Sequence, residues 1–407
     1  MLNLFRSRLF LAITTGHFVV DIFNSIGPVL MAVLATSLGL TNGQIAFALT
    51  WYILLGSLTQ PLFGWLTDRF PGRPSVLAGL SVVWMVIFLG LMAFQTTWML
   101  ILPFFLIASL GSGLFHPIGT ATASLVHQAR AATATSVFFF CGQVGLALAP
   151  AFGGWLFEQG NTFGILPLCA IALLPALLLI TAPALPSTPE SATKTKKHLH
   201  PVVSITLFAV VAFVVLMALR STIQAVYVAF LPKLFADRGW QPSDYGLLAG
   251  VFMFAAAIGN VITGEIANRY GMRAATVWPL LLSIPAGLIC LWAPTVSLTF
   301  MASAIAGLLI CGQHSILVVH AQQLLPTKQG FSAGLILGFT FASGGIGTWI
   351  AGITADYVDL LLVIQIVTLL ALPTALLALT LPGRSDPVIP THPDSATATT
   401  HISTSKF

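Results

Sequence analysis

The sequence predicts an all-helical integral membrane protein with twelve transmembrane helices in two similar halves. Of its 407 residues, 57% are hydrophobic and only 7% are charged, and the mean hydropathy is +0.97. Apolar runs of about 20 residues, enough for a helix to cross a hydrocarbon core of about 30 Å, recur along nearly the whole chain. They lack the alternation of transmembrane strands, so helices are favoured over a barrel. A soluble protein of this length is not expected to have this composition.

The apolar runs give the order of the helices and the domain boundaries. A polar stretch at 183–202, with Pro183, Pro186, Pro189 and a basic run, predicts a cytoplasmic linker between halves at 1–182 and 203–382. The Ser-, Thr- and Pro-rich tail 383–407 is predicted to be disordered. The predicted helices are 9–36, 43–67, 74–95, 98–126, 131–157 and 163–182, then 203–231, 243–267, 274–293, 296–324, 329–355 and 360–381.

Basic residues predict the orientation, because Lys and Arg near helix ends stay in the cytoplasm. With the N-terminus inside, thirteen of the sixteen Lys and Arg fall in cytoplasmic segments, Lys233 and Arg238 fall outside, and Arg220 lies within a helix. Both termini are therefore expected in the cytoplasm. The net charge of +5 follows from this topology, and no nucleic-acid partner is expected.

The two halves repeat a loop motif. Gly64, Asp68 and Arg69 follow the second helix, and Gly264, Asn268 and Arg269 follow the eighth, 200 residues later. His116 in the fourth helix similarly corresponds to His314 in the tenth. Repeats of six helices around a site at the membrane midplane are typical of transporters, in which one half moves against the other.

The loop after the second helix resembles a motif of the major facilitator superfamily, and the resemblance extends over residues 5–382. The motif reads Gly-x-x-x-Asp-Arg-x-Gly-Arg and matches Gly64, Asp68, Arg69, Gly72 and Arg73, with one additional residue before Gly72. The resemblance implies a gate at the cytoplasmic face, to which Asn268 and Arg269 of the second half would contribute. The alternative is a solvated turn whose charges only set topology.

Two further motifs point to export. Gly145, Pro150, Gly153 and Gly154 in the fifth helix are similar to the Gly- and Pro-rich motif of facilitator antiporters, although small residues at this spacing also serve general helix packing. The runs His17-Phe-Val-Val-Asp21 and Phe-His116-Pro resemble the fosmidomycin-resistance group. That resemblance implies proton-driven efflux of small drugs or metabolites across a bacterial inner membrane.

Asp21 is the predicted proton site. His17, Asp21 and Asn24 are spaced four and three apart, so they share one face of the first helix. Polar groups in an apolar segment are unsatisfied against lipid, so this face should point inward. His17 and His116 are the expected proton-coupling partners of Asp21. The alternatives are a permanent Asp21 pair with Arg220 or His17 that stabilises packing, and a His116 that only bonds a neighbouring helix.

Arg220 in the seventh helix is the main candidate for substrate binding. Its permanent charge suits an anionic substrate such as a phosphonate or carboxylate, and equally suits a counter-ion to Asp21. The full set of residues predicted to bind substrate is Asn24, Arg220, Gln224, Gln143, Gln313 and His314.

The leading functional prediction is a proton-coupled antiporter that exports a small amphipathic or anionic compound and acts as a monomer. The alternatives are proton-coupled uptake of an organic acid or sugar-like solute, and a non-transporting receptor with the same fold. The sequence has neither a phosphate-binding loop nor a His-Glu-x-x-His motif, so no enzyme activity, cofactor or metal site is expected. The expected partners are the substrate, protons and the lipid bilayer.

Overall fold

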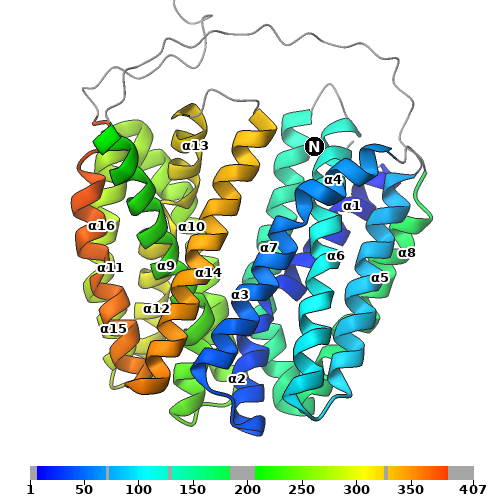
Figure 1. Cartoon of the computed structure of the whole chain (residues 1–407), viewed down its shortest axis with the longest axis horizontal. Coiled ribbons are helices and arrows are strands. Elements are labelled where there is room, and N and C mark those ends of the chain that lie inside the picture. The colour runs from blue at the N-terminus through cyan, green and yellow to red at the C-terminus, as the bar shows by residue number, and fades with distance from the viewer. Residues whose placement is uncertain (1–6, 70–72, 127–130, 184–206, 325–328, 384–407) are drawn as a thin grey trace, which may run out of the picture.

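A computed structural model describes residues 7–69, 73–126, 131–183, 207–324 and 329–383. Within them the chain forms two groups of helices (Figure 1). The first group is α1 (Arg8–Ser25), α2 (Gly27–Leu38), α3 (Asn42–Leu58), α4 (Gln60–Arg69), α5 (Pro74–Ala93), α6 (Trp98–Leu125), α7 (Ala131–Gly160), the 3-10 turn η2 (Asn161–Gly164) and α8 (Ile165–Ile180). The second is α9 (Leu207–Asp237), α10 (Pro242–Tyr270), α11 (Met272–Trp292), α12 (Val296–Cys311), α13 (His314–Leu324), α14 (Gln329–Tyr357), α15 (Leu360–Leu369) and α16 (Ala371–Ala378).

The described helices confirm the predicted membrane architecture. Eleven continuous helical stretches are long and apolar enough to cross a bilayer. One of them, Thr133–Ile180, has 48 residues and contains α7, η2 and α8, which reverse direction at Asn161. This stretch therefore supplies two crossings, which gives the twelve predicted. Large apolar side chains such as Trp155, Phe208 and Trp278 are exposed on the outer surface, as a lipid environment requires.

Several predicted boundaries were wrong in detail. Four predicted helices are interrupted: the first at Ile26 between α1 and α2, the second at Thr59 between α3 and α4, the tenth at Gly312–Gln313 between α12 and α13, and the twelfth at Leu370 between α15 and α16. The seventh ends at Asp237, six residues later than predicted, and its last turns contain an ion pair between Lys233 and Asp237. The predicted linker from residue 184 and the tail from residue 384 lie outside the described residues.

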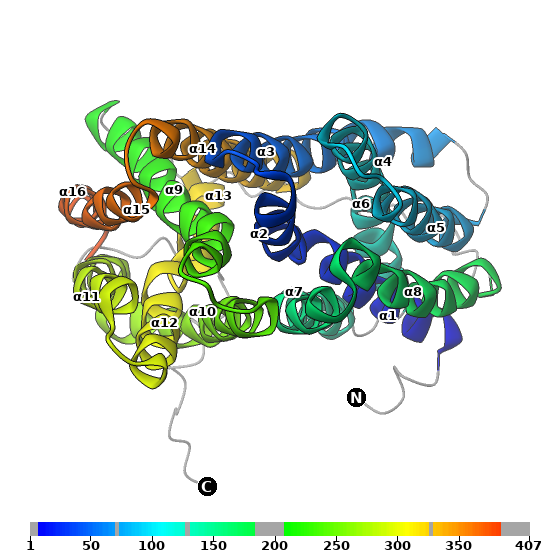
Figure 2. The same cartoon turned by 90° about the horizontal axis from the view of Figure 1, so that it is seen from below.

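The two halves touch mainly toward one end of the molecule. We call the end where α1 begins and α16 ends the terminal face, and the opposite end the far face (Figure 1). The halves meet where α3 packs against α14 and α7 against α10, with α2 beside α9, as the view along the helices also shows (Figure 2). At the terminal face, α4 and α13 pack mainly against helices of their own half.

The repeat is visible in the turns at the far face. Gly39 ends α2 with φ 65°, and Gly239 follows α9 with φ 81°, 200 residues later. Glycine adopts this left-handed conformation without the steric cost that other residues incur. Each turn then leads directly into the helix, α3 or α10, that contacts the opposite half.

Candidate functional site

Helix α1 is the most enclosed element of the first half, surrounded by α5, α6, α7 and α8. Its close approach to α7 depends on two glycines. A Cβ on Gly142 would lie 2.4 Å from Asp21 Oδ2, and one on Gly145 would lie 2.3 Å from the carbonyl oxygen of Phe18. The backbone of α7 therefore lies against the polar face of α1. His17 and Asp21 are buried there, with exposed fractions of 2% and 6%.

Two histidines hold the Asp21 carboxylate from different helices. His17 Nε2 lies 3.2 Å from Asp21 Oδ2, and His116 Nε2 on α6 lies 3.5 Å from Oδ1. The two imidazole rings meet edge to face, with centroids 5.2 Å apart. His17 also stacks on Phe138 of α7 at 3.9 Å. The structure thus brings together the three residues that the sequence suggested for proton coupling.

Backbone carbonyls determine which ring nitrogens carry hydrogen. His17 Nδ1 lies 2.8 Å from the carbonyl oxygen of Phe138, and His116 Nδ1 lies 2.9 Å from that of Ser112. A carbonyl oxygen only accepts, so each Nδ1 must donate a hydrogen. In a neutral ring the Nε2 atom then has a lone pair, which would face the lone pairs of the carboxylate. Each Nε2 to carboxylate contact therefore needs a proton, on the imidazole or on Asp21.

A neutral network extends from the same carboxylate. Asn24 Nδ2 donates to Asp21 Oδ1 at 3.1 Å and lies 3.0 Å from Ser112 Oγ. Tyr52 on α3 donates its hydroxyl hydrogen to Asn24 Oδ1 at 3.2 Å. Asn24, which is predicted to bind substrate, therefore connects α1, α3 and α6 around the Asp21 carboxylate.

The ligand atoms of His17, Asp21 and His116 lie within 4.8 Å of one another, which is compact enough for a divalent ion. Proton binding suits the cluster better, because Asp21 Oδ1 already accepts from Asn24 and Gly142 of α7 lies directly against Oδ2. The cluster is reached through His116, whose side chain is 22% exposed against 3% for His17.

Arg220 forms a second polar centre in the other half. Its side chain is buried, with Nη2 donating to the carbonyl oxygen of Cys311 at 2.8 Å and Nη1 to His314 Nδ1 at 3.1 Å. The carbonyl of Cys311 is available because α12 ends there. Within the described residues Arg220 forms no ion pair, and its Nε and the Gln313 Oε1 lack hydrogen-bond partners. The partners of Asp21 are thus His17 and His116, and the suggested Asp21–Arg220 pair is not formed.

The other predicted residues are more scattered. Gln224 lies one turn after Arg220 on α9 and is half-buried. Gln143 is exposed on α7. It lies one turn before Ala147, which contacts Gly250 of α10, so Gln143 is on the side of α7 that faces the second half.

The predicted gating residues divide between the two faces. The described residues do not include Gly72 or the side chains of Asp68 and Arg69. Gly64 lies close to Pro117 of α6, and Arg73 directly precedes α5. Asn268 is exposed near the end of α10, where Arg269 pairs with Glu265. On α7, Gly153 packs on Ile26, while Pro150 and Gly154 contact α10. The α7 motif is therefore part of the contact between halves as well as of packing against α1.

Sequence reasoning missed four contributors to the first centre: Tyr52, Ser112, Gly142 and the backbone carbonyl of Phe138. Ser112 could have been found, because it precedes His116 by one helical turn. Tyr52 lies on α3, and Gly142 and Phe138 lie on α7, so only the packing of these helices brings them to α1.

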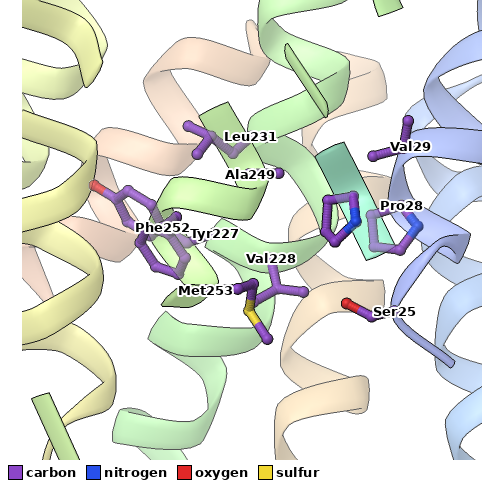
Figure 3. Close-up of a pocket in the computed structure, with 10 residues that line it drawn as sticks. Ser25, Pro28, Val29, Tyr227, Val228, Leu231, Ala249, Phe252 and Met253 are labelled. Carbon is purple, nitrogen blue, oxygen red and sulfur yellow. The ribbon is translucent and has the colours of Figure 1, made fainter. Parts of the chain in front are cut away.

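The halves close tightly between these centres and the far face. Figure 3 shows the small cavity there, lined by residues of both halves that include Pro28 and Val29 of α2 and Tyr227 and Phe252 of the second half. Its volume of ≈ 10 Å³ leaves room for about one water molecule. The two halves are therefore in close contact around this cavity.

A bundle of twelve membrane-crossing helices, built as two similar halves with buried ionisable residues in each, is the architecture of a secondary transporter. Residues 13–234 and 213–406 match the sequence profile of the Major Facilitator Superfamily, and the chain belongs to this family.

Curated relatives and solved structures agree with this assignment. The chain is 26% identical over 370 residues to the Fosmidomycin resistance protein of Escherichia coli (strain K12), covering 89% of each protein. It is 28% identical over 352 residues to the uncharacterized MFS-type transporter YfnC of Bacillus subtilis (strain 168), covering 84% of each. A bacterial homolog of the lysosomal transporter Spinster shares the fold with TM-score 0.76 at 15% identity, covering 92% of this chain and 96% of that one. A D-xylose-proton symporter shares the fold with a TM-score of 0.70 at 16% sequence identity, and the match covers 92% of this chain and 98% of that one.

Proposed function

We propose that this protein is a proton-coupled antiporter of a bacterial inner membrane that exports a small amphipathic or anionic compound. The observation that carries the proposal is the Asp21 carboxylate between His17 and His116, whose Nδ1 atoms both donate to backbone carbonyls. This arrangement needs at least one more proton than a deprotonated Asp21 and two neutral imidazoles carry together. It is a proton-binding site at membrane depth, where ionisable residues are costly and are retained for function.

Loss of the proton would change the packing of three helices. Without it, two Nε2 lone pairs face a carboxylate, and Asp21 keeps only the hydrogen bond from Asn24. Because His17, His116 and the Phe138 carbonyl belong to α1, α6 and α7, repulsion within the cluster acts on the positions of these helices. Proton binding and release can thereby bias the two orientations of the halves, which proton coupling requires.

Arg220 is the proposed substrate anchor. Arg220 is buried and has no carboxylate partner among the described residues, so its guanidinium retains a positive charge that an anionic group can neutralise. Its neighbour His314 accepts from Arg220 through Nδ1, so its Nε2 carries a hydrogen and is a second donor. The proton site and the substrate site would then lie in different halves of the transporter.

The direction of transport is inferred from the relative named for fosmidomycin resistance and from the Gly- and Pro-rich segment of α7. The terminal face is assigned to the cytoplasm because, among the described residues, Arg8, Arg73, Arg269 and Arg273 lie at that end, whereas Lys233 and Arg238 lie at the other. As a family transporter the chain is proposed to act without enzyme activity, and as a monomer.

Drug susceptibility tests the proposal in cells. Expression should raise resistance to fosmidomycin or to a compound in a panel of unrelated antibiotics, and an uncoupler should abolish the increase. Asp21→Asn should give no resistance, whereas Asp359→Asn, which changes a carboxylate that caps α15 within its own half, should behave like the wild type. Uncoupler-sensitive accumulation of a nutrient without any resistance would instead establish uptake.

A further inference from the structure

The far face carries the same polar contact twice, once in each direction between the halves. At the end of α14, the Asp356 carboxylate accepts hydrogen bonds from the backbone N–H groups of Asn42 at 2.7 Å and Gly43 at 2.9 Å, which begin α3. At the end of α7, Glu158 Oε2 accepts from the backbone N–H of Ser243 at 3.0 Å, which begins α10. Each half thus provides a carboxylate to the first turn of a helix in the other.

The internal repeat relates the two contacts. Ser243 follows Gly43 by 200 residues, the same offset as between the two left-handed glycines, Gly39 and Gly239. Glu158 and Asp356 both lie in the last turn of their helices, 198 residues apart. A surface contact that arose by chance would not be expected to recur at symmetry-related positions.

The carboxylates bond the N–H groups that each helix start cannot satisfy itself. In α3, Thr41 and Gln44 form a capping box, which leaves the N–H groups of Asn42 and Gly43 for Asp356. In α10, Gln241 provides no side-chain cap and Pro242 has no N–H, which leaves Ser243 for Glu158. Helix N-termini also favour negative charge.

Small residues at the same positions allow the approach. A Cβ on Gly43 would lie 2.7 Å from Asp356 Oδ2, and one on Gly154, one turn before Glu158, would lie 2.2 Å from the carbonyl oxygen of Pro242. The contacts therefore depend on the halves being closed at the far face and break when the halves separate there.

We propose that Glu158 and Asp356 are a symmetric pair of latches that hold the far face closed and set the population of the conformation seen here. The pair acts on the conformational equilibrium of the substrate-free protein, independently of the proton site and of the substrate. Removing either carboxylate shifts the protein toward the conformation open at the far face, and removing both shifts it further.

Distances between spin labels on full-length protein in lipid nanodiscs test this directly. One pair of labels, at Thr96 and Ser297, lies at exposed positions on the far face of the two halves. A second pair, at Leu125 and Asn268, lies at exposed positions on the terminal face. Cys141 is replaced by alanine in this background, because the other three cysteines are buried.

The variants are Glu158→Ala, Asp356→Ala and the double substitution, with Asp359→Asn as control. Asp359 is an acidic residue of the same face, but it caps α15 of its own half at Leu362 N. Each latch substitution should raise the ratio of far-open to far-closed populations about two- to fivefold, the effect expected of one charge at a helix N-terminus, and the double substitution by roughly the product. The far-face distance should lengthen and the terminal-face distance should shorten, because rocking moves the two ends in opposite directions.

Wild-type distance distributions in the double variant would overturn the proposal. So would a longer far-face distance without a shorter terminal-face distance, because the two halves would then not be rocking between two orientations. If Asp359→Asn changed the distance distributions equally, the effect would come from the net charge of the far face, and this result would also overturn the latch proposal. The measurement needs neither substrate nor a proton gradient, so failure of the transport proposal would not change its result.

Discussion

At the scale of single residues, the central feature is a carboxylate whose neighbours are arranged to need a proton. The i, i+3 and i+4 spacing of His17, Asp21 and Asn24 was sufficient to predict a shared polar face. The partners from other helices, His116 and Tyr52, reach that face through tertiary packing. Sequence spacing also left open an Asp21–Arg220 pair, which the described residues do not form. The assignment of Asn24 to substrate stays a prediction, and in this conformation Asn24 bonds Asp21.

Asp21→Asn tests the proton assignment. Asparagine nearly matches the shape of aspartate but does not titrate, so gradient-driven transport in proteoliposomes should be abolished. Substrate counterflow, which needs no net proton release, should remain. Uphill transport at the wild-type rate would rule out Asp21 as the proton site. Loss of folded protein from the membrane would indicate a packing role instead.

Arg220→Lys tests the substrate anchor. A lysine ammonium is a point charge and does not reproduce the two-pronged contact of a guanidinium with a phosphonate or carboxylate. Binding of anionic compounds should weaken about tenfold or more, corresponding to roughly 1.4 kcal/mol, whereas binding of neutral compounds should change little. Titration of both classes against detergent-solubilised protein provides the comparison. Equal losses in the two classes would argue for a structural role of Arg220 at the end of α12.

At the scale of helices, the cluster around Asp21 packs closely because α7 presents glycine to α1. The hydropathy pattern predicted twelve crossings and most of their bounds, because each must span the same apolar thickness. It did not predict the interruptions at Ile26, Thr59, Gly312–Gln313 and Leu370. Near Ile26, Pro28 has no N–H to continue the helical hydrogen bonds. The one after Cys311 is functionally relevant, since the carbonyl at the end of α12 accepts from Arg220.

Gly142→Ala should disrupt the site by steric overlap. The added Cβ would lie 2.4 Å from both Asp21 Oδ2 and His17 Cε1, so α1 and α7 must separate or the cluster must rearrange. Overpacking of this kind costs about 1–3 kcal/mol, and the midpoint of thermal unfolding in detergent should fall by several degrees, with transport reduced.

Gly90→Ala on α5 is the matched control. A Cβ at Gly90 meets no atom within 4 Å, so stability should stay level or rise slightly, since alanine is the better helix former. If the two substitutions had equal effects, the close contact at Gly142 would not be important for the site.

At the scale of the whole molecule, two half-transporters with different polar centres meet at a closed far face. The first half holds an acid between two histidines, and the second holds a buried guanidinium that bonds His314 and the carbonyl of Cys311. The internal repeat was readable from the sequence through the loops at residues 64–73 and 264–273. The carboxylate contacts between the halves were not, because a single Glu or Asp at a helix end has no signature until its partner helix is placed.

Movement of protons against substrate tests the central claim most directly. Proteoliposomes are loaded with a pH-sensitive dye, and the compound to which expression gives the greatest resistance is added outside. Antiport through Asp21 predicts that the lumen becomes alkaline as substrate enters and protons leave, whichever way the protein is inserted, and that Asp21→Asn abolishes the signal. Acidification of the lumen would establish symport. Substrate entry without any pH change, or the full signal in Asp21→Asn, would contradict proton coupling at this site.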